Sequence, residues 1–223
     1  MVGGREATVV ARERIEAVER ASTADGLLEA TESLAACGDP LAVPCLLQVL
    51  GFNNPGAAVA AVDGLIRIGK EAVEPLLRNL DTPNYGARAW AVRALAGIGD
   101  VRGLEVLIDA LRHDIGPSVR RAAARGLGTL RLGDSDVKSR CHALERCLAA
   151  LESGSGDGEW IVRYAVAVGM ESLGLTMVET DEQRGRILNA MARLASIPQE
   201  PTQVVRMRAS LARTRLINHW EMG

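Results

Sequence analysis

Residues 56–69 read GAAVAAVDGLIRIG, and residues 86–99 read GARAWAVRALAGIG. The two stretches align without a gap at an offset of 30 residues. The positions that they share are Gly56, Ala57, Ala61, Val62, Leu65, Ile68 and Gly69, each with its counterpart 30 residues later. A weaker copy follows as SVRRAAARGLG at 118–128. Self-similarity at a fixed period of this size is typical of proteins built from stacked repeats.

A second apolar pattern precedes each of these stretches. It consists of Val43, Leu46, Leu47 and Leu50, then Val73, Leu76, Leu77 and Leu80, then Leu104, Leu107, Ile108 and Leu111. This spacing places the side chains on one stripe of a helix, so each repeat is predicted to be a pair of helices. A helix pair that buries one face must stack on its neighbours. We therefore predict an all-α fold, an α-solenoid (superhelix) of HEAT-like helix pairs, although HEAT repeats are usually about 40 residues long.

The pairs are predicted to form one domain over residues 1–223, with about five to six helix pairs. Three glycines, Gly38, Gly69 and Gly99, follow second helices, where a left-handed C-cap favours glycine. Asp39-Pro40 is expected to cap the next helix, and segments 53–56 and 81–84 to separate the two helices of a pair. The Gly- and Ser-rich segment 152–159 is predicted to be a mobile loop. Residues 181–220 are expected to form a weaker C-terminal capping pair.

Composition narrows the possible functions. The formal net charge of −2 argues against a general nucleic-acid binder. No run of residues is long and apolar enough to cross a membrane, and the start of the chain lacks a secretory signal. The four cysteines show no zinc-ligand spacing, so no metal site is expected. The protein is therefore expected to work in the cytoplasm, without a nucleic-acid partner.

The second helix of each pair has a buried and an outward face, because an α-helix turns by about 100° per residue. In the helix around residues 86–98 the predicted buried set is Arg88, Ala91, Val92, Leu95 and Ile98. Trp90 and Arg93 fall on the opposite face. The same count places Asp63, Arg121, Arg125 and Tyr164 on the outward faces of the other second helices.

Two kinds of arginine follow from this division. Arg88, Arg120 and Arg163 begin second helices on the buried side. An arginine near a core must be paired, so these three are expected to bond across to acids or loop carbonyl groups of a neighbouring repeat.

The outward arginines suit a ligand surface, because an arginine can bind a carboxylate with two hydrogen bonds. An ordinary solvated face remains the alternative for this set. Trp90 favours the ligand surface, because a large aromatic side chain on an exposed face tends to mark a contact site.

Four longer strings carry a family resemblance: GFNNPGAAVAAVDGLIRIG, NYGARAWAVRALAGIGD, SVRRAAARGLG and EWIVRYAVAVGMESL. Over residues 25–175 the sequence resembles the F-type subunits of the phycobilin lyases, HEAT-repeat proteins that attach linear tetrapyrroles to phycobiliproteins in cyanobacteria. It is most similar to the F subunit of the lyase for the phycocyanin α chain.

The resemblance implies a heterodimer with an E-type lyase subunit. The substrate would be phycocyanobilin or phycoerythrobilin, and no cofactor would be permanently bound. A cysteine of the acceptor, the phycobiliprotein α subunit, would add to the ethylidene group of bilin ring A to give a thioether. The chain would then work in the cytoplasm, peripheral to thylakoid-associated phycobilisomes. The isomerising members carry an adjacent His-Cys pair, which this sequence lacks, so isomerase activity is disfavoured.

On this interpretation the outward residues become candidate bilin contacts. Trp90 and Tyr164 would stack on the rings, and Arg93, Arg121 or Arg125 would bind the propionates. Asp63 is the candidate catalytic residue, because a carboxylate can hydrogen-bond pyrrole N–H groups and favour their protonated form. Two other functions stay open. One is a chaperone-like protein that assists phycobiliprotein folding or chromophorylation without catalysing attachment. The other is a scaffold or dismantling factor that binds phycobilisomes.

Overall fold

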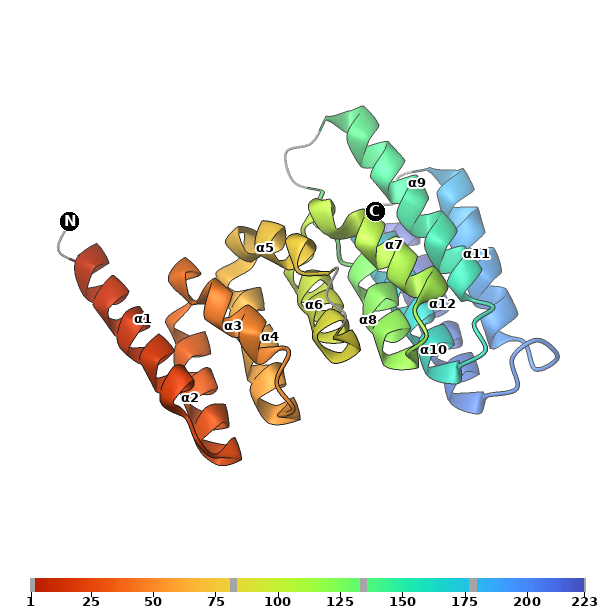
Figure 1. Ribbon diagram of the computed structural model, residues 1–223. Helices are drawn as coiled ribbons and strands as arrows, with labels where there is room; N and C mark the ends of the chain where they lie inside the picture. The colour runs from red at the N-terminus through yellow and green to blue at the C-terminus, as the bar shows by residue number, and fades with distance from the viewer. Residues whose placement is uncertain (1–2, 81–83, 133–135, 177–179, 223) are drawn as a thin grey trace. The chain divides into compact units, whose positions relative to one another are not determined.

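The computed structural model describes residues 3–80, 84–132, 136–176 and 180–222. Within these ranges it contains twelve α-helices and three short 3-10 helices. They form two compact units, residues 1–98 (unit 1) and residues 99–223 (unit 2). The all-α solenoid predicted from the repeats is confirmed, with six helix pairs in the described residues (Figure 1).

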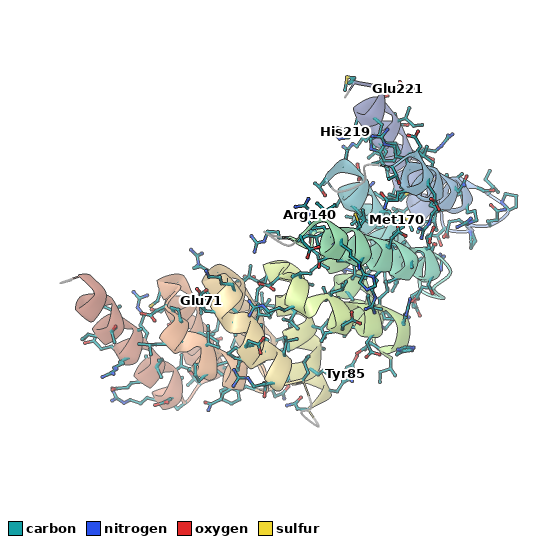
Figure 2. All side chains as sticks on the ribbon, turned by 90° about the horizontal axis from the view of Figure 1, so that it is seen from above. Glu71, Tyr85, Arg140, Met170, His219 and Glu221 are labelled. Atoms are coloured by element: carbon teal, nitrogen blue, oxygen red, sulfur yellow. The ribbon has the colours of Figure 1, made fainter. Side chains whose placement is uncertain are left out.

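Unit 1 contains the first three helix pairs. Its helices are α1 (Gly3–Arg20), α2 (Ala24–Cys37), α3 (Val43–Val49), α4 (Pro55–Ile68), α5 (Val73–Arg78) and α6 (Tyr85–Ile98). The second helices α2, α4 and α6 pack side by side in that order. Figure 2 shows Tyr85 at the start of α6.

Unit 2 contains the other three pairs. Its helices are α7 (Leu104–His113), α8 (Pro117–Leu127), α9 (Val137–Gly154), α10 (Trp160–Thr176), α11 (Asp181–Ala195) and α12 (Gln203–Met222). The second helices α8, α10 and α12 form one layer, with α10 in the middle, and the first helices α7, α9 and α11 cover it. Met170, labelled in Figure 2, lies fully buried on α10.

The helix ends lie at the glycine, asparagine and aspartate residues that the sequence places there as caps. Gly38, Gly69 and Gly99 have positive φ, which only glycine adopts without strain. Asn54 caps α4, because its side chain accepts a hydrogen bond from the backbone N–H of Ala57. Asp39 is an N-cap, as expected, because its side chain accepts a hydrogen bond from the backbone N–H of Leu41. The helix that it caps is a 3-10 helix (Pro40–Ala42) that leads into α3. Of segment 81–84, only the last residue lies within the described ranges.

The predicted buried stripe is confirmed in α6. Ala91, Val92, Leu95 and Ile98 are at most 3% exposed. Glycine lets two second helices of unit 2 approach closely: a Cβ on Gly128, at the end of α8, would overlap the backbone of Gly169 on α10. The core therefore combines buried Leu, Ile and Val side chains with small residues at the points where helices approach most closely.

Two segments singled out in the sequence make specific contacts with other helices. Asp157, within 152–159, accepts hydrogen bonds from Arg120 on α8. Trp220 on α12 donates to the carbonyl of Gly174 at 3.1 Å, and its ring lies 5.5 Å from the guanidinium carbon of Arg184. The mobility of 152–159, the capping role of 181–220 and the single domain stay predictions. Among the described helices, none has the length and apolar character to cross a membrane.

Candidate functional site

The arginines that begin the second helices of unit 2 tie repeats together. On α8, Arg120 donates through Nε and Nη2 to Asp157, at 2.7 and 2.9 Å. Its Nη1 donates to the carbonyls of Asp114 and Ile115, in the loop before α8. On α10, Arg163 bonds in the same way to its own loop and to Glu200 of the next one. The structural role predicted for Arg120 and Arg163 is confirmed.

Unit 1 ties its repeats together with a different side chain. The amide of Asn54 donates to the carbonyl of Ala24, 30 residues earlier, at 2.9 Å. Asn84 donates in the same way to Gly51 at 3.1 Å. Arg88 is half-buried, and its guanidinium carbon lies 5.5 Å from the centre of the Tyr85 ring. The bond expected between Arg88 and a neighbouring repeat stays a prediction. The sequence interpretation missed the asparagines, although both occupy the same place before a second helix.

In unit 2 the outward candidates meet around one hollow of about 320 Å³, between α8, α10 and the start of α12. We call it the α10 hollow. The residues that line it are Arg121, Arg125, Trp160, Ile161, Tyr164, Ala165, Val168 and Val204. The three unit 2 residues predicted from the sequence therefore lie together. Trp160, Ile161 and Val204 were missed, although Trp160 stands four residues before Tyr164, the spacing of one helical face.

The hollow has a cationic wall and an apolar wall. Arg121 and Arg125 lie exposed on α8, and within the described part of the chain neither side chain has an ion pair or hydrogen bond. Trp160 and Tyr164 present their rings from α10, and Val204 adds an apolar contact from α12. Exposed Met207 and Leu211 continue this apolar wall along α12. The arrangement suits a flat apolar molecule that carries carboxylates.

An ion cluster around the buried Glu171 lies one helical turn beyond the hollow. Glu171 on α10 is bonded by Arg208 and Arg215 of α12, and only 7% of its side chain is exposed. Unlike the contacts of Arg120 and Arg163, this cluster has no equivalent in the preceding repeat of unit 2. The residues 43 positions before Glu171 and Arg208 are Gly128 and Ala165. The cluster contains one more positive than negative charge.

The unit 1 candidates lie on the neighbouring helices α4 and α6. Asp63 is exposed on α4, and Arg93 is exposed on the neighbouring α6. Trp90 is half-buried, and the guanidinium carbon of Arg93 lies 5.4 Å from its ring centre. This cation–π contact holds the charge over the aromatic face. A ring that stacks on this face of Trp90 must therefore displace Arg93, whereas a carboxylate can bind on top of it.

The comparison of the sequence with known families and curated proteins agrees with this architecture. HEAT repeats, as a family, match residues 11–96 and 73–168. The "Phycobilisome maturation protein" of Synechococcus elongatus is 44% identical over 92% of this chain and 97% of its own length. The "Phycocyanin alpha phycocyanobilin lyase CpcF" of Synechocystis sp. is 49% identical over 78% of this chain and 81% of its own length.

A solved structure gives the same result. One chain in the complex of CpcE and CpcF of the phycocyanin lyase from Nostoc sp. superposes with a TM-score of 0.69 at 40% identity. The match covers 78% of this chain and 99% of that one. Fold, repeat pattern and sequence identity agree, and the chain belongs to the HEAT-repeat family of CpcF-type phycobilin lyase subunits and phycobilisome maturation proteins.

Proposed function

We propose that the chain is the F-type subunit of a heterodimeric bilin lyase. With an E-type partner it attaches a linear tetrapyrrole to a cysteine of a phycobiliprotein, namely the phycocyanin α chain. The observation that supports this most directly is the meeting of Arg121, Arg125, Trp160 and Tyr164 at one hollow, in a chain 49% identical to a phycocyanin α lyase subunit. Bilin is substrate here, and the place of action is the cytoplasm, beside the phycobilisomes.

The reaction is an addition. The acceptor's thiolate forms a C–S bond to the exocyclic ethylidene carbon of ring A, the ring-to-ethylidene double bond is consumed, and a proton ends on the ring carbon. Nothing leaves, so the protein has two tasks: it orients the bilin beside the thiol, and it assists the proton transfer. The nucleophile belongs to the acceptor, so no cysteine of this chain takes part.

We assign bilin binding in unit 2 to the α10 hollow. Tyr164 and Trp160 stack against pyrrole rings, and Arg121 and Arg125 bind a propionate. Ligand sites usually span about 300–1,000 Å³, so a hollow of about 320 Å³ holds only part of a tetrapyrrole. The rest of the pigment lies along the exposed apolar side chains Met207 and Leu211.

The unit 1 group supplies the second set of proposed contacts. Arg93 binds a propionate from its position over Trp90. Asp63 accepts hydrogen bonds from pyrrole N–H groups and favours their protonated form, which makes ring A more electrophilic. These roles are independent of the α10 hollow, so each group can be tested by itself.

A chaperone-like function is the second candidate, because a relative that covers nearly the whole chain is named a maturation protein. Such a protein would raise the yield of folded phycobiliprotein without forming the thioether. The two functions differ in whether covalent pigment appears on an acceptor that is already folded.

The test is reconstitution with purified chain, E-type subunit, folded apo-phycocyanin α and phycocyanobilin or phycoerythrobilin. Covalent pigment is measured by absorbance of the acceptor after denaturation in acidic urea. We expect pigment with both subunits and none when either is omitted. Pigment yield that is independent of this chain would contradict the lyase function, and a gain in folded acceptor alone would support the chaperone.

The residue assignments need separate variants in the same assay. Arg121→Gln with Arg125→Gln removes the cationic wall of the hollow, and Asp63→Ala and Arg93→Ala remove the unit 1 contacts. We expect each change to lower covalent pigment. Arg193→Gln, an exposed arginine on α11, is the matched control and should leave the yield unchanged.

A further inference from the structure

Three arginines of unit 2 occupy the same place in successive repeats, 43 residues apart. They are Arg120 on α8, Arg163 on α10 and Arg206 on α12, and we call them the ladder arginines. In each of them Nη1 donates to two carbonyls of its own loop, five and six residues earlier. For Arg206 these are the carbonyls of Pro201 and Glu200, at 2.8 and 2.7 Å.

In two of the three ladder arginines, the guanidinium edge formed by Nε and Nη2 binds a carboxylate. Nε and Nη2 of Arg120 bond Asp157, and those of Arg163 bond Glu200, in each case 37 residues ahead and with both oxygens engaged. The same edge of Arg206 has no hydrogen-bond acceptor among the residues that the structure describes. Because the loop carbonyls fix Arg206 in the pose of the other two, this edge is pre-oriented for a carboxylate.

The side of α12 that carries this edge does not continue the stack of helices. The position occupied by buried Leu127 on α8 and buried Met170 on α10 holds exposed Arg213 on α12. Ser210 and Thr214 beside it are also exposed. A polar outer face of this kind ends a solenoid. An apolar helix pair therefore does not fit here, whereas an acidic loop does.

A second copy of this chain is a poor source for the acid. Asp157 and Glu200 stand three residues before the start of a second helix, and the same place in unit 1 holds Ala21, Phe52 and Thr82, none of which is a carboxylate. The acid at this place before α8, Asp114, is buried. In unit 2, Asp157 and Glu200 are already bonded to Arg120 and Arg163. The acid is thus more readily supplied by a different protein.

We propose that Arg206 is a docking point for the E-type partner subunit, and that its free edge binds an Asp or Glu side chain in a loop of that subunit. This contact would repeat, across a protein interface, the arginine–carboxylate pairing that Arg120 and Arg163 make within the chain. Arg213 on the same face adds positive charge and steers the acidic loop. This inference rests on the proposed heterodimer and names the surface through which it forms.

The experiment measures affinity between the purified full chain and the E-type subunit, without pigment, by calorimetry. Arg206→Glu should weaken binding more than about tenfold, which corresponds to about 1.4 kcal/mol. Arg206→Lys keeps the charge and a donor for the loop carbonyls but loses the two-pronged edge, so an intermediate loss is expected. Arg193→Glu is the matched charge control and should bind like the unchanged chain. Far-UV circular dichroism and thermal unfolding check that each variant folds.

A second measurement identifies the acid. With Arg206→Lys, a carbodiimide joins the introduced lysine to a carboxylate in contact with it, and mass spectrometry locates the linkage. A linkage to an Asp or Glu of the E-type subunit supports the proposal. Equal affinity of the unchanged chain and folded Arg206→Glu, or a linkage to this chain, would overturn it. Pigment transfer by the unchanged proteins in the reconstitution assay tests the proposed function separately from these results.

Discussion

Arg163 on α10 holds Glu200 with two parallel hydrogen bonds, Nε to Oε2 at 2.5 Å and Nη2 to Oε1 at 2.8 Å. Both side chains are largely buried, and that of Glu200 is only 1% exposed. Glu200 also accepts from the backbone N–H of Thr202. The pair therefore joins α10 to the loop before α12. The start of α12 forms one side of the α10 hollow.

Breaking this pair should destabilise unit 2. Arg163→Leu leaves a buried carboxylate without its cation, which costs about 3–5 kcal/mol. The measurement is urea unfolding followed by circular dichroism. The control is Arg20→Leu, which removes the exposed pair of Arg20 with Glu16 and should leave the midpoint unchanged. Equal midpoints for Arg163→Leu and the unchanged chain would refute the prediction.

The same pair predicts how stability depends on pH. The hydrogen bonds from Arg163 lower the pKa of Glu200. A carboxyl group whose pKa is lower in the folded than in the unfolded chain stabilises the fold at any pH above its unfolded pKa, which is about 4.3 for Glu. This stabilisation is lost as the pH falls through the pKa of the folded state. The free energy of unfolding, measured from pH 6 downward, should therefore decrease once the pH is lower than about 4.3. Glu200→Gln should reduce this fall, and an identical pH profile would contradict the assignment.

The close approach of α8 and α10 gives a third prediction. A methyl group at Gly169 would overlap the carbonyl oxygen of Ala124, so Gly169→Ala should push the helices apart and lower the unfolding temperature. Gly185→Ala on α11 is the matched control, because nothing lies within 4 Å of its added Cβ, and alanine favours the helix by about 1 kcal/mol. Gly185→Ala should therefore hold or raise the unfolding temperature, whereas a tolerated Gly169→Ala would show that the contact is not needed.

The cysteines give a fourth prediction. Burial raises the pKa of Cys147 to about 12 and that of Cys45 to about 11, so neither forms the reactive thiolate near neutral pH. Cys141 is exposed. Iodoacetamide at pH 7.5 should label Cys141 in the folded chain and spare the two buried thiols, as read by mass spectrometry. Cys141→Ser should keep full pigment transfer, because the thioether forms on the acceptor. Loss of transfer in that variant would point to a cysteine of this chain in the reaction.

Much of the architecture can be predicted from the sequence, because buried apolar residues recur along each helix at the helical period. The positions of Ala91, Leu95 and Ile98 predicted a buried stripe, and Arg120 and Arg163 predicted contacts between repeats, since an arginine beside a core needs partners. The outward face also follows from helix geometry, which places Arg121, Arg125 and Tyr164 on the faces that line their common hollow.

The remaining features depend on three-dimensional neighbours that periodicity does not specify. Val204 reaches the hollow only because α12 packs beside α10, and Glu171 meets Arg208 and Arg215 for the same reason. The Arg93 guanidinium over Trp90 depends on side-chain rotamers. These contacts join two helices or depend on side-chain rotamers, so the apolar periodicity of one helix cannot predict them.

The central claim is that the α10 hollow binds the bilin that this chain and its partner transfer. The most direct measurement is visible absorbance and circular dichroism of phycocyanobilin titrated into the heterodimer, with Tyr164→Ala and Arg121→Gln/Arg125→Gln compared with Arg193→Gln. We expect saturable binding with an induced circular dichroism signal for the unchanged protein and the control, weakened at least about tenfold in the two hollow variants. Unchanged binding and transfer in folded hollow variants would contradict the claim.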